Sequence, residues 1–299
     1  MTLFCLGCKH RNIVKHNGEK DLISFKPVFG ISYTEIARRS QNGLSFNHFG
    51  YQLEPEWKMR FVSNDSTSIY SPTKKRFINF PLTRGYDSIF NTARSWLKVK
   101  AMTKDSMIIE LLKAYADSVD TRGAKVYMVF YSDKYINNVL HGDISKCKSP
   151  SRRDTVYIQS LTNAAGKDFT KAFAARQPVE IESKSPHVTF SKRHTEPTML
   201  NNFDASYDYM NPEFDIAIDK AYSNFYYSFS IFVDPAGQIH YGKPLTAFSE
   251  KSYEENYIHL STAVMNSYLK YYLNFIPGKT LGIVHTSEIA VHVTGNRGV

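Results

Sequence analysis

The chain has 299 residues, of which 42% are hydrophobic and 14% aromatic, and its formal net charge is +9. A chain of this length and composition buries a sizeable core, which excludes an intrinsically disordered protein. No apolar run approaches the ~20 residues of a membrane helix, and the first 18 residues lack the long apolar run of a signal peptide. Because three cysteines also argue against a disulfide framework, we expect a soluble, cytoplasmic protein without membrane contact.

The positive charge is concentrated in the first half of the chain. Residues 1–160 carry 25 Lys and Arg against 14 Asp and Glu, whereas residues 161–299 carry 12 against 14. A one-sided positive field indicates an anionic partner, such as nucleic acid, an acidic membrane or an acidic protein; the alternative is a chance skew that serves only solubility.

In chain order, the first half predicts strands followed by an alternation of helices and strands. Short apolar stretches at 24–35 and 44–70, broken by Pro, Gly, Asn and Ser, predict strands and loops. Apolar residues at helical spacing predict a helix over 103–119, preceded by helical structure at 86–99. The remaining expected elements are a strand at 124–133, a helix at 134–141, a strand at 154–160, a helix at 163–176 and a strand at 179–184.

The second half contains the clearest local signals. Asp234–Pro235–Ala236–Gly237 predicts the turn of a β-hairpin, because Pro presets φ and Gly takes the left-handed position. A long helix is expected at 253–276, with Ser252 and Glu255 as a capping box. Two terminal strands are expected at 280–286 and 288–294.

These elements predict an α+β fold, with a mixed β-sheet packed against two or more helices and with a C-terminal hairpin, long helix and two terminal strands. The region 191–215 is polar and irregular, and a weak seam lies near 191–212. We therefore divide the chain into a basic α/β region at 1–190 and a hairpin–helix–strand region at 191–299, packed together as one compact unit.

Two basic segments in the first half are candidates for nucleic-acid contact. Their Lys and Arg side chains suit phosphates, and the interleaved aromatic rings suit stacking on unpaired bases. The alternative for each is a solvated loop beside core aromatics. The candidate residues are Lys74, Lys75, Arg76, Phe77, Phe80, Arg84, Tyr86, Lys146, Lys148, Arg152 and Arg153.

A repeated His-x-Thr triplet supplies a candidate catalytic site. His187 and Thr189 lie in one expected strand, and His292 and Thr294 lie in another. The repeat resembles the two-histidine phosphoesterases, which carry two His-x-Thr/Ser motifs on neighbouring strands. That resemblance implies one histidine as general base, the other as general acid, and the threonines as phosphate ligands. The alternative is two ordinary pairs of polar strand residues.

Metal sites have weaker support in the sequence, and we expect no metal or other cofactor. Cys5 and Cys8 have the spacing of two zinc ligands, but no second such pair completes a four-ligand site. Asp154 with Glu182 and Lys184 fits the pattern of a magnesium-dependent nuclease. Alternating charges are, however, also what the solvent face of any strand carries.

The favoured function is nucleic-acid binding through the basic first half, without catalysis of its own, and the composition suits a viral or mobile-element protein. A phosphodiesterase that uses the two His-x-Thr motifs is the enzymatic alternative. An assembly or structural protein, with aromatic side chains making protein contacts, is the third hypothesis.

Overall fold

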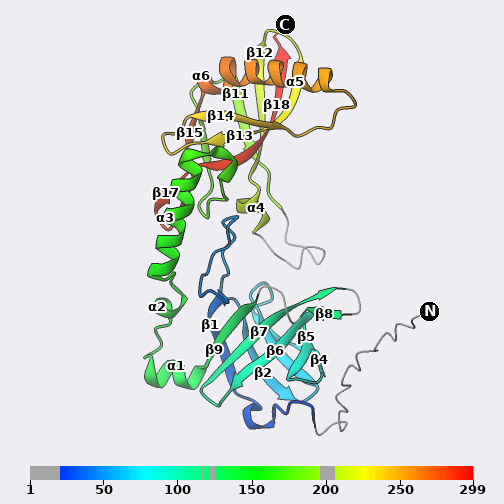
Figure 1. Ribbon diagram of the computed structural model, residues 1–299, viewed down its shortest axis with the longest axis vertical. Helices are drawn as coiled ribbons and strands as arrows, with labels where there is room; N and C mark the ends of the chain where they lie inside the picture. Colours follow the sequence, from blue (N-terminus) through cyan, green and yellow to red (C-terminus); the bar gives the residue numbers. More distant parts are fainter. Residues whose placement is uncertain (1–20, 116–117, 121–124, 196–205, 299) are drawn as a thin grey trace, which may run out of the picture. The chain divides into compact units, whose positions relative to one another are not determined.

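The computed structural model describes residues 21–115, 118–120, 125–195 and 206–298. Internal contacts divide the chain into two units. Unit 1 comprises residues 1–43 and 54–149, and unit 2 comprises residues 44–53 and 150–299. Figure 1 shows the elements of each unit.

Unit 1, as far as it is described, is built on a nine-stranded antiparallel sheet. The sheet closes on itself, because β6, at one end of the strand order, also pairs with β7 near the other end. Its strands are β1 (Ser32–Ser40), β2 (Lys58–Ser63), β3 (Ser66–Ser71), β4 (Arg76–Arg84), β5 (Ile89–Thr92), β6 (Ser95–Met102), β7 (Ser106–Tyr115), β8 (Ser118–Asp120) and β9 (Val126–Ser132). The helical elements are η2 (Lys26–Val28), α1 (Asp133–Val139) and α2 (Ser145–Lys148).

Side chains fill the interior of this closed sheet. Alternate residues of each strand point inward, and Phe25 stacks on Phe61 with ring centroids 4.0 Å apart. The core also contains Val28, Tyr33, Met59, Leu82, Phe90, Leu97, Met107, Ile109, Met128 and Phe130. Because the interior is occupied by large side chains, the outer surface is the part of unit 1 that remains for ligands.

Unit 2 contains a five-stranded sheet in the order β11-β12-β18-β13-β14. Its central strands β12 and β18 are parallel, and the other pairs are antiparallel. The strands of the unit are β10 (Glu180–Ser183), β11 (Val188–Lys192), β12 (Glu213–Ala221), β13 (Phe225–Val233), β14 (Ile239–Pro244), β15 (Leu273–Ile276), β16 (Lys279–Thr280), β17 (Ile283–Val284) and β18 (Ser287–Arg297).

A long helical segment packs on one face of this sheet (Figure 1). Val264, Met265 and Leu269 are buried against strand residues such as Ile216 and Val291. The helical elements of unit 2 are α3 (Arg152–Lys167), η3 (Phe169–Lys171), α4 (Tyr207–Met210), α5 (Lys251–Val264), the π-helical turn η4 (Met265–Leu269) and α6 (Lys270–Tyr272).

The expected α+β fold class is wrong, because 45% of the residues that the structure describes are in strands and 23% are helical. The main cause is the stretch expected to be helical at 103–119, which forms β7 and β8. In β7 the inward-facing Met107 and Ile109 are buried, but so are the outward-facing Glu110 and Leu112. Burial on both sides of a strand removes the strict alternation of apolar and polar residues that identifies it.

Other elements agree in part with the expectation. The hairpin at 234–237 is confirmed as β13–β14, and β9, α1 and β10 also lie where strands and a helix are expected. The expected strand at 154–160 is instead part of α3. The expected long helix ends early, at Tyr272, and its N-cap is Glu250 rather than Ser252.

The internal contacts place a division of the chain between the two units. The boundary lies between Ser149 and Pro150, and residues 44–53 join unit 2. Phe46 packs there with Ile158 and Phe173. The buried carboxylate of Asp154 caps α3 and also accepts a 2.6 Å hydrogen bond from Ser45 N. This bond attaches the segment 44–53 to unit 2.

Candidate functional site

The face of the five-stranded sheet opposite the helix is polar. Alternation along β12 and β18 places Phe214 and Val291 in the core, whereas Asp215 and His292 point to the other face. The open face combines charged and hydroxyl side chains with small residues such as Ala290. Such a surface offers hydrogen-bonding groups and leaves space above them.

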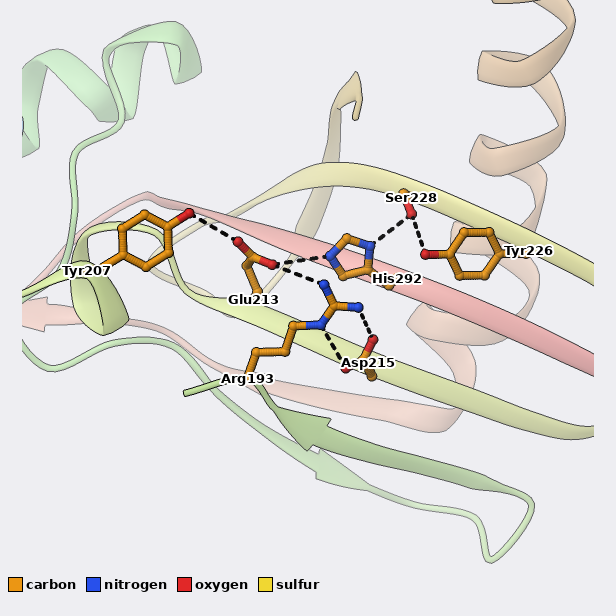
Figure 2. Close-up of polar contacts among 7 residues, drawn as sticks. All are labelled: Arg193, Tyr207, Glu213, Asp215, Tyr226, Ser228 and His292. Atoms are coloured by element: carbon orange, nitrogen blue, oxygen red, sulfur yellow. Dashed lines mark hydrogen bonds and ion pairs between the residues drawn. The ribbon is translucent and has the colours of Figure 1, made fainter. Parts of the chain in front are cut away.

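A row of four side chains crosses this face at one level. Ser191 lies opposite Asp215, Asp215 opposite His292, and His292 opposite Ser228. Paired positions of neighbouring strands lie about 5 Å apart, so their side chains reach one another. Arg193, immediately after β11, lies beside this row (Figure 2).

His292 is the centre of the network in Figure 2. Its Nδ1 is 2.8 Å from Ser228 Oγ, and its Nε2 is 3.4 Å from Glu213 Oε2. The second contact is an ion-pair distance rather than an aligned hydrogen bond, and Nε2 is otherwise buried without a partner. The carboxylate beside Nε2 favours the tautomer with its proton there, which leaves Nδ1 as a hydrogen-bond acceptor for Ser228.

Arg193 neutralises the acidic side of the network. It donates two hydrogen bonds to Asp215, of 2.8 and 2.6 Å, and lies 3.3 Å from Glu213. These bonds from Arg193 lower the pKa of Asp215, and they raise the pKa of Arg193 itself. Burial, together with the nearby Glu213, raises the pKa of Tyr207.

A cleft of about 400 Å³ lies next to His292. The polar groups on its wall include Glu213, Lys243 and Glu288. Its other lining residues are Tyr207, Met210, Asn211, Pro212, Ser230, Leu245, Ile289, Ala290 and His292. This volume is within the usual range for small-molecule sites, which is roughly 300–1,000 Å³.

The structure does not bring the two predicted histidines together. His187 lies in the turn before β11, where its carbonyl accepts a hydrogen bond from Asp219 N, and Asp219 is level with Asn296 on β18. His292 is four residues back along β18. At about 3.3 Å per residue and 4.8 Å per strand, the two Cα atoms are about 16 Å apart. The predicted two-histidine arrangement is therefore not formed, because β12 separates the turn that carries His187 from β18, which carries His292.

The two threonines of the same motif do lie near each other. Thr189 and Thr294 both pair with Ala217, and all three line a second hollow of about 220 Å³ on the open face. They lie on the opposite side of the Asp215–His292 row from the larger cleft. No histidine lines this hollow among the described residues.

The predicted magnesium arrangement is not formed either. Asp154 is fully buried and accepts hydrogen bonds from Ser45 and Ser151, whereas Glu182 is exposed on β10 and accepts one from Asn274. Within the described ranges, no three His, Cys, Asp or Glu side chains are grouped closely enough to hold a metal ion. The proposed zinc ligands Cys5 and Cys8 lie outside the described residues.

In the first basic segment, the residues at the hairpin tip are exposed, whereas Arg84 at the other end is bonded within the protein. Lys74, Lys75 and Arg76 are exposed where β3 turns into β4, and Lys75 has the left-handed φ of 50° that this turn requires. Arg84 is instead only 14% exposed, and it donates a hydrogen bond to the carbonyl of Ile23.

The aromatic rings of this segment are less available for base stacking than expected. The Arg60 guanidinium lies 4.7 Å from the ring centroid of Phe77, and Tyr70 packs edge-on against the same ring. Phe80 is half-buried and shares the inward face of β4 with the core residue Leu82. Tyr86 is 42% exposed and remains the accessible ring of the predicted set.

The second basic segment lies at the boundary between the units. Lys146 and Lys148 belong to α2 in unit 1, and Arg152 and Arg153 begin α3 in unit 2. All four side chains are exposed. Each is therefore available to an anion, but they do not belong to one unit.

Sequence reasoning missed the partners of His292. The stretch containing Glu213 and Asp215 was interpreted as irregular, and Ser228 as an ordinary hairpin residue. A usable signal was the alternation in residues 213–218, Glu-Phe-Asp-Ile-Ala-Ile, which is typical of a strand with one polar face.

No protein-family model matches the chain, and no curated protein resembles its sequence. Among the described residues, no helix is both long and apolar enough to cross a membrane.

Proposed function

We propose that the protein binds nucleic acid through phosphate contacts on the outer surface of unit 1. The observation that carries this proposal is the hairpin tip of Lys74, Lys75 and Arg76, three consecutive exposed cations at the end of a two-stranded projection. Cations presented in this way reach a phosphate backbone without rearrangement of the fold.

The distribution of charge between the units supports the same surface. Unit 1 carries 23 Lys and Arg against 13 Asp and Glu, whereas unit 2 carries 14 against 15. The positive field therefore belongs almost entirely to unit 1, where Arg60 adds a further exposed cation one strand away from the tip. A field of this kind attracts a polyanion over a distance of about 8–10 Å in physiological salt.

The state of the aromatic rings determines the kind of binding that we propose. Because the ring of Phe77 is covered by Arg60 and Phe80 faces inward, base stacking contributes little apart from Tyr86. Binding then depends on charge, with a strong salt dependence and little preference for sequence.

The test is a titration of labelled single- and double-stranded DNA and RNA of about 20 nucleotides at several salt concentrations. The variant carries Lys74→Gln, Lys75→Asn and Arg76→Gln together, because Asn tolerates the left-handed conformation of residue 75. The matched control removes three exposed lysines of unit 2, with Lys184→Gln, Lys251→Gln and Lys270→Gln.

Loss of three phosphate contacts reduces the slope of log K against log salt by about 2–3, at roughly 0.7–0.9 per contact. The control variant has the same net charge but should keep the slope of the original protein. An unchanged slope in the hairpin variant, or an equal reduction in the control, would remove the hairpin tip from the binding surface.

A further inference from the structure

We propose that unit 2 carries a serine-based acyl-transfer site, with Ser228 as nucleophile, His292 as general base and Glu213 as the group that orients the base. The substrate class is a small carboxylic ester that binds in the 400 Å³ cleft lined by His292 and Glu213. This site is independent of the nucleic-acid surface of unit 1.

The geometry of the three residues supports this assignment. Nucleophilic catalysis by serine requires a base within hydrogen-bonding distance of Oγ and a third group on the far side of that base. Ser228 Oγ is 2.8 Å from His292 Nδ1, and Glu213 Oε2 is 3.4 Å from the other ring nitrogen (Figure 2). His292 can act as the base through Nδ1, because the carboxylate keeps the proton on the opposite ring nitrogen.

Strand pairing or neighbouring side chains hold each of the three residues in place. Ser228 and His292 are paired residues of β13 and β18 in the middle of a sheet. Glu213 is contacted by Tyr207 at 3.4 Å and by Arg193 at 3.3 Å. Rigid strands therefore hold the nucleophile and base in place, as a preorganised site requires.

Tyr226 lies beside the nucleophile. Ser228 Oγ donates a 3.1 Å hydrogen bond to the Tyr226 hydroxyl, and the Tyr226 side chain is 60% exposed. For the reaction the Ser228 proton must turn from Tyr226 to His292 Nδ1, and the Tyr226 hydroxyl then keeps its own proton to donate. The oxyanion shares its carbon with Ser228 Oγ, so a phenol beside Oγ can donate to it, as an oxyanion hole does.

The reaction conserves atoms and protons in two steps. Ser228 Oγ attacks the ester carbon, its proton passes to His292 Nδ1, and the bond to the leaving alkoxide breaks as His292 returns the proton to it. Water then attacks the acyl-serine, His292 takes a proton from that water, and the carboxylic acid leaves as the proton returns to Ser228. No oxidant, reductant or metal is needed.

The decisive experiment treats the wild-type protein with a fluorophosphonate, which phosphonylates activated serines, and locates the label by peptide mass spectrometry. We expect the label on Ser228. This measurement needs no variant, so a folding defect cannot obscure it. Absence of the label from Ser228 in the folded protein would overturn the proposal.

Variants then separate the roles of the residues. Ser228→Ala should abolish labelling, and His292→Asn should slow it at least about 10²-fold, since general-base catalysis contributes roughly 10²–10⁴-fold. Glu213→Gln should lower kcat on p-nitrophenyl butyrate while leaving KM nearly unchanged, which a merely structural role would not do. Labelling at the same rate in folded His292→Asn protein would contradict the assignment of the base.

Two further variants provide controls. His187→Asn and Ser160→Ala change an exposed histidine and an exposed serine outside the site, and both should label at the rate of the original protein. Ala290→Phe, between Glu213 and Ser230 on the cleft floor, should block ester hydrolysis by filling the cleft. Undiminished hydrolysis by Ala290→Phe would show that the substrate does not use this cleft.

Discussion

The pH dependence of stability should be dominated in one range by a single buried histidine, His285. Its ring is fully buried and stacks on Phe173 with centroids 3.7 Å apart. Nδ1 lies 3.1 Å from the carbonyl of Thr286, and Nε2 lies 3.0 Å from the hydroxyl of Thr280. The carbonyl requires a proton on Nδ1, so Nε2 accepts from Thr280 and the ring is neutral.

Burial lowers the pKa of His285 from 6.5 to about 4, although the hydrogen bond to Thr286 acts in the opposite direction. The unfolded chain therefore binds a proton below about pH 6.5, while the folded protein does not bind it until about pH 4. Stability from this group is complete above about pH 6.5 and is lost as the pH falls toward about 4. At 1.36 kcal/mol per pH unit, the total loss is about 3 kcal/mol.

The assay compares the original protein with His285→Gln, which removes the titrating group. Unfolding free energies come from hydrogen exchange in urea, read on peptides that contain β13 and β18. Exchange is needed because both tryptophans, Trp57 and Trp96, lie in unit 1 and report on that unit. The difference between the two proteins should shrink by about 3 kcal/mol between about pH 7.5 and pH 4.

A direct titration of the His285 ring by NMR should give a midpoint near pH 4. A midpoint near 6.5, or a free-energy difference that is constant over this pH range, would refute the reasoning from burial.

Three further predictions concern stability. Glu35→Gln should cost about 3–5 kcal/mol, measured by urea unfolding in tryptophan fluorescence, because the buried carboxylate accepts two hydrogen bonds from Arg38 and two from the backbone amides of Glu56 and Trp57, which a neutral amide cannot all accept; a cost below about 1 kcal/mol would contradict this. Asp154→Ala should lower thermal stability by about 1–3 kcal/mol, because it removes the capping box of α3 together with the bond that holds Ser45; an unchanged melting temperature would argue against this role. Gly50→Ala should cost at least about 2 kcal/mol by calorimetry, because Gly50 has a φ of +90° and an added Cβ would collide with backbone atoms of residue 174; a neutral effect would show that the loop shifts freely.

The local elements that the sequence predicts correctly are those with a specific chemical cause. The hairpin at 234–237 follows from Pro and Gly in a turn, and Asp234 additionally accepts hydrogen bonds from Ala236 N and Gln238 N. The charged strand at 180–183 is also confirmed, with Ile181 buried and the two glutamates exposed. In these cases nearby residues determine the conformation.

The incorrect elements depend on partners far away in the sequence. The stretch 106–115 is a strand because β6 and β9 pair with it on either side, and Glu110 and Leu112 on its outer face are buried as well as its inward residues. Helical spacing of apolar residues in that stretch is therefore coincidental. Likewise, the expected cap at Ser252 lies two residues inside the true cap of α5, Glu250, which is the last extended residue.

The candidate site shows the same division between local and distant information. His292 was identified from its motif, and the strand that carries it is confirmed, but its expected partner His187 lies two strands away. The groups that do contact it, Ser228 and Glu213, come from positions 64 and 79 residues earlier in the chain. Only the register of β12, β18 and β13 brings these three together, and no spacing in the sequence encodes that register.

The two units differ in where a ligand can be accommodated, and the reason is the way each sheet is covered. In unit 1 the sheet closes around its own core, so chemistry is confined to projecting side chains such as the tip at Lys74–Arg76. In unit 2 the helical segment covers one face of an open sheet, and the opposite face keeps alanines at 217 and 290 where larger residues would fill the hollows. Strand alternation then places Glu213, Asp215, Glu288, His292 and Thr294 of β12 and β18 beside that space. A surface of projecting cations suits a long polyanion, whereas a hollow lined by His292 and Glu213 suits a small molecule. Each unit, taken by itself, therefore suits a different kind of ligand.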